Sequence, residues 1–304
     1  MEANPMFTGK TNEFWAHVKF ITEKLGYSRN NQVISHSKEK IINKFNELHI
    51  NYIEDTLDEA IEYTEYRKDV LNNIVKNSLM NVEEASHLFQ KYYKVSKENG
   101  YTVSLPLNKQ KGIKKDYAFF TCIINIITEQ TLRKLKVSHN NDNPSEVILD
   151  LFGKEDTDMT PPLFNDDPKN FVYILDKDNY LDGILTRRFD GAFPSLVNPK
   201  AIWEIKEYYY TTTFGSRIAD GVYETQLDGF EINSLSEKVF GDIKHIYFID
   251  SKQTWWDKGK SYLCRIIDML HIGLVDEVIF GKEVETRWPI VLEKIVNLPD
   301  VESF

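Results

Sequence analysis

Two acids and a lysine stand within one short stretch of the chain, in the order Asp190, Glu204 and Lys206. Glu204 and Lys206 belong to the run 201–206, Ala-Ile-Trp-Glu-Ile-Lys, whose first residues are apolar and favour a β-strand. Because successive side chains of a strand alternate between its faces, Glu204 and Lys206 point the same way, with Cα atoms about 7 Å apart. Ile205 then points into a core. An isolated charge inside a protein is costly unless it is paired or binds a metal, so this strand predicts a functional site.

The chemistry that these residues suit is metal-dependent hydrolysis of a phosphodiester. Mg²⁺ prefers oxygen ligands from carboxylates and water, so Asp190 and Glu204 are the candidate metal ligands. Lys206 would orient or deprotonate the attacking water and offset the charge of the phosphate. The ion would lower the pKa of its bound water and stabilise the charge that develops in the transition state.

An acid, a variable gap and then Glu-x-Lys on a strand is a pattern that resembles the PD-(D/E)xK nuclease superfamily, which includes most type II restriction endonucleases. The proline that commonly precedes the acid is replaced here by Phe189. The resemblance implies a restriction-endonuclease-like core, Mg²⁺ as cofactor and double-stranded DNA as partner. It also implies a homodimer, because a two-fold protein matches two-fold DNA.

The layout after Lys206 resembles that of type II restriction enzymes that cut GATC, over about residues 187–280. A Gly-Ser turn at 215–216 opens a helix, and an apolar strand over 245–249 then runs into Asp250 and a Trp-containing loop that we expect to be polar. This likeness supports the superfamily more than a particular target sequence.

A further metal ligand is predicted on a helix before the sheet, where this superfamily often supplies a carboxylate. Glu129 lies at the border of the apolar face of a helix expected over 116–136. The alternative is that Glu129 is a solvated residue at the rim of that face.

Candidate contacts to DNA phosphates come from two places near the site. Arg187 and Arg188 form a basic pair just before Asp190. Ser216 and Arg217 stand at a helix start, where free backbone N–H groups bind anions. Other basic clusters lie at 109–115 and 133–136, and for these a solvated surface is an equal alternative. Glu224 and Gln226, on the helix after the site strand, are candidates for one further polar residue near the site.

The (D/E)-x-K spacing also occurs at three other places, Asp167/Lys169, Asp242/Lys244 and Asp250/Lys252. These acids lie in a polar loop or at the ends of a strand, where a carboxylate is ordinarily solvated. For Glu204 and Lys206 the alternative to a catalytic site is a same-face ion pair on an exposed edge strand.

The composition narrows the class of protein. A net charge of −10 over 304 residues argues against a generic nucleic-acid coating protein, which is usually basic, but leaves room for an enzyme with one basic cleft. The chain has no apolar run of 18 residues and no secretory signal, so no membrane partner is expected. Two cysteines, Cys122 and Cys264, fit a reducing cytoplasm.

Hydrophobic periodicity predicts an α/β fold behind a helical region. We expect a helical accessory region over 1–108 and a nuclease domain over 109–304. In the second part we expect a hairpin of strands 171–175 and 183–193, the site strand 201–206, and a helix with Ile218, Val222, Leu227 and Phe230 inward. A strand at 245–249, a helix at 254–273, a strand at 274–280 and a closing helix at 288–298 complete it. The strands are too apolar for a one-sided sheet, so a mixed central sheet flanked by helices on both faces is predicted.

Three functions remain open. The first is a Mg²⁺-dependent type II restriction endonuclease that cuts duplex DNA at a short site. The second is a structure-selective repair, recombination or phage nuclease on the same fold. The third is a non-catalytic DNA-binding protein on a decayed nuclease fold.

Overall fold

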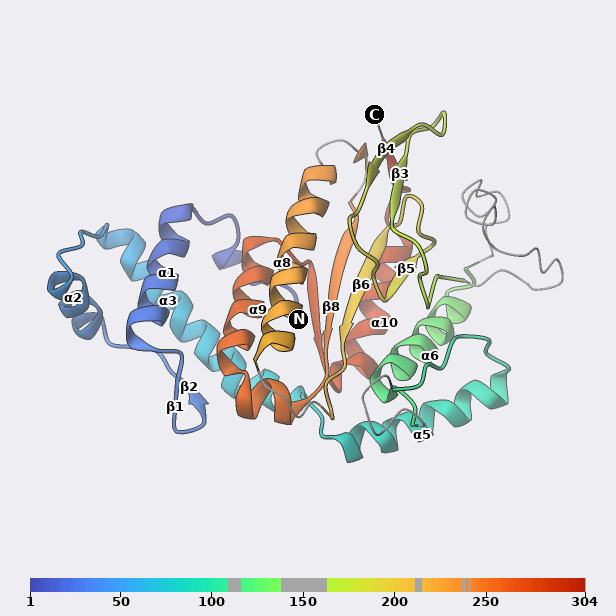
Figure 1. Ribbon diagram of the computed structural model, residues 1–304, viewed down its shortest axis with the longest axis horizontal. Helices are drawn as coiled ribbons and strands as arrows, with labels where there is room; N and C mark the ends of the chain where they lie inside the picture. Colours follow the sequence, from blue (N-terminus) through green and yellow to red (C-terminus); the bar gives the residue numbers. More distant parts are fainter. Residues whose placement is uncertain (109–115, 138–162, 211–214, 237–238, 241, 304) are drawn as a thin grey trace.

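The computed structural model describes residues 1–108, 116–137, 163–210, 215–236, 239–240 and 242–303. At its centre is a four-stranded sheet with the order β5–β6–β8–β9 (Figure 1). The strands are β5 (Gly191–Phe193), β6 (Ala201–Lys206), β8 (Lys244–Ile249) and β9 (Glu277–Phe280). β5 runs antiparallel to β6, whereas β6, β8 and β9 are parallel. The predicted mixed sheet is confirmed.

Helices cover both faces of this sheet, as predicted (Figure 1). One layer holds α6 (Phe119–Lys134) and α10 (Glu283–Val296), and the other holds α8 (Ser216–Ser236) and α9 (Lys260–Ile272). Alternation along β8 serves both layers, because Ile246 and Phe248 join the core with α6 and α10, whereas Tyr247 and Ile249 join the core with α9. By the same alternation Glu204 and Lys206 face the α8 side of β6.

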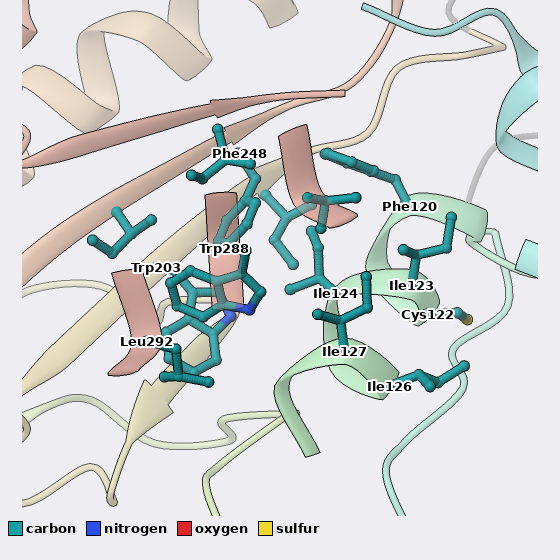
Figure 2. Packing of buried hydrophobic residues seen from close by; sticks show 14 of the residues in the cluster. Phe120, Cys122, Ile123, Ile124, Ile126, Ile127, Trp203, Phe248, Trp288 and Leu292 are labelled. Atoms are coloured by element: carbon teal, nitrogen blue, oxygen red, sulfur yellow. The ribbon is translucent and has the colours of Figure 1, made fainter. Parts of the chain in front are cut away.

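The core between β6, α6 and α10 is built on large aromatic rings (Figure 2). Trp203 of β6 meets Trp288 of α10 with ring centroids 5.6 Å apart, and Trp288 meets Phe248 at 5.1 Å. Gly191 of β5 lies against the Trp203 ring, where an added Cβ would come within 2.1 Å of a ring atom. A residue without a side chain is therefore required directly after Asp190, which fixes how closely β5 approaches β6.

An N-terminal helical region is also confirmed. It contains α1 (Asn12–Leu25), α2 (Lys38–Glu47), α3 (Glu54–Val70), the short hairpin of β1 (Ser28–Arg29) and β2 (Gln32–Val33), a continuation of α3 through Leu71–Val75 and Lys76–Ser78, and α5 (Val82–Asn99). α5 packs against α6, and the buried Phe89 shares the core of α6 and α10. The division at residue 108 stays a prediction.

The predicted hairpin is present but its second strand is shorter than expected. β3 (Tyr173–Leu175) pairs antiparallel with β4 (Leu181–Ile184), and β5 begins only at Gly191. β3 and β4 form a two-stranded sheet of their own. In the segment that follows β4, Thr186 donates to Glu231 of α8 through its backbone N–H and its hydroxyl. Asp190 is therefore the residue before a strand.

Two predictions of exposure are wrong. Ile218 and Val222 of α8 are buried as expected, but Leu227 and Phe230 are exposed. The buried stripe continues instead through Asp228 and Gly229, since a Cβ on Gly229 would come within 2.3 Å of the Leu274 carbonyl oxygen.

The turn after β8 exposes Gln253, Asp257 and Lys258 but buries its two tryptophans and Asp250. Asp250 accepts hydrogen bonds from Tyr208 N–H and from Trp255 Nε1 at 3.1 Å, and both Trp255 and Trp256 are fully buried. This turn is a wide helical segment over Lys252–Lys258, so α9 begins later than predicted, at Lys260. A short pair, β7 (Val239–Phe240) with β10 (Glu302–Ser303), completes the strands that the described ranges contain.

Candidate active site

The structure brings Asp190 beside the strand that carries Glu204 and Lys206. The backbone N–H of Asp190 donates to the carbonyl oxygen of Trp203 at 3.0 Å. Its Oδ2 accepts a hydrogen bond from the backbone N–H of Ile205 at 2.7 Å. The pairing of Gly191 with Trp203 places Asp190 opposite Glu204 at the end of the β5–β6 pair.

Glu204 is held by two cations. Lys206 Nζ donates to Glu204 Oε1, and Arg187 donates to both oxygens, from Nη2 to Oε1 at 2.9 Å and from Nη1 to Oε2 at 3.3 Å. Glu204 and Lys206 are each only 5% exposed. Burial by itself would raise the pKa of Glu204, but the charges of Lys206 and Arg187 outweigh it and hold that pKa below its ordinary value. Burial by itself would lower the pKa of Lys206, but the negative charge of Glu204 acts against this, and the pKa of Lys206 is raised.

α8 adds two more carboxylates to this group. Arg187 Nη1 donates to Asp228 Oδ2 at 2.7 Å, and Asp228 is only 2% exposed. Glu224 Oε2 lies 3.6 Å from Arg187 Nη2 and 3.7 Å from Lys206 Nζ, and it reaches solvent. Burial raises the pKa of Asp228 to about 7, with Arg187 acting against the shift and Glu204 adding to it.

Asp228 is the residue that the sequence analysis missed. Glu224 and Asp228 are spaced i, i+4, which places them on one face of a helix, and this spacing was the available signal. Glu224, weighed against Gln226 as a polar neighbour of the site, is the one for which the structure gives contacts with site cations.

We name Asp190, Glu204, Glu224, Asp228, Arg187 and Lys206 the acid cluster. It holds four carboxyl groups and two cations. Burial raises the pKa of Asp190 to about 7, and the negative charge of Glu204 adds to the rise. Asp190 is an exposed residue, because its side chain opens into a cavity that water can enter, although many protein atoms surround it.

That cavity has a volume of about 690 Å³ and lies where β6 ends. Arg187 and Asp190 line it, as do Ile205, Glu207 and Tyr208 from the end of β6. Its other walls come from the loop before α6, the start of α6 and residues 166–171. Asp190 and Arg187 are therefore members of the acid cluster that also line the cavity.

Of the other predicted site residues, Glu129 is engaged away from this group. The carboxylate of Glu129 is buried and accepts bonds from Arg133 Nε at 2.7 Å and from the backbone N–H groups of Thr102 and Val103, each at 3.1 Å. The structure thus engages Glu129 with its own helix and a loop. Arg188 is exposed at the cavity. Ser216 and Arg217 begin α8, but their side chains lie outside what the structure describes, as does the basic cluster at 109–115.

Two models of protein families match the chain. The model of the family described as "Domain of unknown function (DUF7687)" matches residues 80–160 and 148–295. The chain belongs to this family. The whole acid cluster lies inside the DUF7687 match, and residues 1–74, with α1 to α3, match a second family, "Domain of unknown function (DUF7690)". No curated protein and no solved structure matches the chain.

None of the described helices is long and apolar enough to cross a membrane.

Proposed function

We propose that this DUF7687 protein is a Mg²⁺-dependent endonuclease that hydrolyses phosphodiester bonds in DNA. The observation that carries the proposal is the hydrogen bond from Ile205 N–H to Asp190, which sets the acid just before β5 beside Glu204 and Lys206 of β6. An acid directly before β5, with Glu-x-Lys on the neighbouring strand β6, supports the proposal of a restriction-endonuclease-like core.

The residues present fit a hard divalent cation. All the candidate ligands are carboxylate oxygens, and the four carboxyl groups of the acid cluster outnumber its two cations, so a bound cation would relieve repulsion between the acids. Proteins commonly bind Mg²⁺ through one or two carboxylates together with water and substrate phosphate, and Asp190 and Glu204 would supply such carboxylates.

Each protein group has a separate role in the proposed reaction. Asp190 and Glu204 would hold the ion, which when bound activates water and offsets charge on the phosphate. Lys206 keeps its proton, since its pKa is raised, and so orients water and neutralises phosphate rather than acting as a base. Arg187 also bonds to Asp228, so it keeps a partner if Glu204 turns toward an ion.

The finer proposal is a type II restriction endonuclease that works as a homodimer in the cytoplasm and cuts duplex DNA at a short site. A two-fold enzyme would cut both strands of a palindrome symmetrically. Incubation with unmodified phage DNA and Mg²⁺, followed by mapping of the ends, tests this. Discrete fragments with one end sequence support it, whereas a smear or dependence on branches supports a structure-selective nuclease. Sedimentation of the protein bound to DNA gives the stoichiometry.

The catalytic assignment is tested by Lys206→Ala with Lys244→Ala as the matched control. Lys244 has the same Asp-x-Lys spacing but lies at the start of β8, where it pairs with Asp242 and Asp276 at 3.1 Å each. We expect Lys206→Ala to cut at least about 10²-fold more slowly, to keep its circular dichroism spectrum and to keep its affinity for DNA. Lys244→Ala should cut at nearly the wild-type rate. Wild-type cleavage by Lys206→Ala would refute the assignment.

A further inference from the structure

Hydrogen bonds connect the segments that form the walls of the cavity beside the acid cluster. Ser104 N–H donates to Asp166, which joins the loop before α6 to the segment at 163–171. Asn125 of α6 donates to the Ser104 carbonyl oxygen at 2.9 Å. Asn165 exchanges backbone hydrogen bonds with Ala192 of β5 at 2.9 and 3.0 Å. The cavity is therefore framed by the sheet and by α6.

Its size suits one small ligand. A volume of about 690 Å³ falls within the range of about 300–1,000 Å³ that encloses a single small molecule. A DNA duplex, whose major groove alone is about 12 Å wide, cannot enter it. If the substrate is a nucleic acid, what enters is a single nucleotide.

The side chains that line the cavity favour a nucleotide whose base points inward and whose phosphate stays outside. The interior carries the carboxyl groups of Asp166 and Glu207, whose burial raises their pKa values, that of Glu207 to about 7. Acids repel a phosphate but accept hydrogen bonds from the amino groups of bases. The exposed apolar side chains of Leu107 and Phe171 and the exposed Arg188 also line the cavity, and exposure places them at its mouth.

The mouth also adjoins the proposed catalytic residues. Asp190 and Arg187 belong to both the cavity lining and the acid cluster. A base that enters the cavity would pass the flat face of Phe171, which can stack on any base. Its phosphate would stay outside, near Arg187, Arg188 and Asp190.

We propose that the cavity binds one unstacked nucleotide of the DNA substrate, with the base inside and the phosphate at the acid cluster. This inference rests on the proposed nuclease activity and adds the substrate class. The DNA that is cut has a nucleotide that is unpaired, or rotated out of the helix, beside the scissile phosphate. Extruding a base from a paired duplex costs a few kcal/mol, and the cost is least for a mismatched or single-stranded base.

The test is binding without cleavage, measured by fluorescence anisotropy with EDTA present. Two duplexes are compared that differ only in one unpaired nucleotide next to the mapped cleavage position. We expect the duplex with the unpaired nucleotide to bind at least about tenfold more tightly, since less unpairing is needed. Phe171→Ala should reduce this preference to about threefold or less. Tyr180→Ala, which removes an exposed aromatic ring at the tip of the β3–β4 hairpin, should keep it.

The outcomes separate the two proposals. Equal binding of the two duplexes, or an unchanged preference in Phe171→Ala, would overturn the cavity assignment while cleavage of paired DNA by the wild-type protein still supported the nuclease. A wild-type protein that cut no paired, unpaired or single-stranded DNA with Mg²⁺ would overturn the nuclease proposal itself.

Discussion

The Asp190 carboxyl and the backbone N–H of Ile205 share a hydrogen bond of 2.7 Å, which binds the turn before β5 to the middle of the Glu204-Ile205-Lys206 tripeptide. One carboxyl oxygen is used in this bond, and the side chain still opens into the cavity. The acid is thus fixed in position by the backbone of the strand whose side chains it would assist. Its protonation then becomes the property that the proposed activity depends on most.

The rate of cleavage should rise with pH through neutrality. Burial, with the charge of Glu204 adding to it, raises the pKa of Asp190 to about 7, and a carboxyl group binds a metal only after it loses its proton. At one subsaturating Mg²⁺ concentration we expect the rate to climb about tenfold per pH unit below 7 and to level off above about 8. A pH–rate profile measures this, with EDTA abolishing cleavage throughout. A flat profile down to pH 5.5 would contradict it.

The stability of the metal-free protein should change with pH in the opposite direction. An unfolded Asp has a pKa of about 3.9, so between about pH 4 and pH 7 the folded protein keeps a proton on Asp190 that the unfolded chain has lost. The free energy of unfolding therefore falls as pH rises through this window. Asp190→Asn removes this contribution, so its stability relative to wild type should improve from pH 5 to pH 7.5. Urea unfolding in EDTA at both pH values measures it, and an unchanged difference would count against a raised pKa.

Arg187→Met should unfold more easily, and Mg²⁺ should restore part of the loss. Arg187 bonds to Glu204 and Asp228, and without it two buried carboxylates lose a compensating charge. We expect a loss of roughly 2 kcal/mol or more in the free energy of unfolding. A divalent ion can replace the missing charge, so the loss measured by urea unfolding should shrink as Mg²⁺ is added.

The matched control for this effect is Arg133→Met. Arg133 also bonds to a buried carboxylate, that of Glu129, but away from the acid cluster. Its loss should destabilise the protein without recovery by Mg²⁺. Equal recovery in both variants would make the effect non-specific or would place a metal at Glu129.

Gly221→Ala should slow cleavage without destabilising the fold. Gly221 lies in α8, and a Cβ there would come within 3.1 Å of Lys206 Cε and of the Tyr208 hydroxyl. Alanine stabilises a helix interior by up to about 1 kcal/mol relative to glycine, whereas the tight contact displaces Lys206. We expect about a tenfold lower cleavage rate at unchanged or higher melting temperature, since a misplacement of this kind costs up to about 10²-fold. A normal rate would show that Lys206 need not be held closely.

Arg67→Ala should destabilise the whole chain in one transition. Arg67 of α3 is 1% exposed and donates through Nη1 to both oxygens of Asp268 on α9, at 2.7 and 2.9 Å. The bond joins the DUF7690 region to α9, which covers one face of the central sheet, and leaving Asp268 without it costs about 3–5 kcal/mol. Urea unfolding followed by tryptophan fluorescence and by circular dichroism should give coincident curves at a lower midpoint. Two separate transitions would show that the regions unfold independently.

Much of the site's local arrangement followed from the sequence. Alternation along a strand is a property of the backbone, so Glu204 and Lys206 had to share a face and Ile205 had to enter the opposite core, as it does. The connection between β5 and β6, residues 194–200, is short and so favours neighbouring strands, which is how Asp190 comes to lie beside Glu204. The apolar runs of β8 and β9 predicted helices on both faces of the sheet, because a strand with apolar residues on both sides must be covered on both sides.

Only the tertiary structure decided which face each helix turns toward the core and which residues at the ends of strands are buried. Leu227 and Phe230 continue an apolar pattern that starts at Ile218, yet α8 buries Asp228, because Arg187 pairs with it and Gly229 lets the helix approach Leu274. Asp250 ends a strand, where water is the usual partner, but Tyr208 and Trp255 from separate segments close over it. Periodicity along a chain fixes which residues share a face, whereas the partners that face each other are set by long-range packing, and no spacing within one segment encodes them.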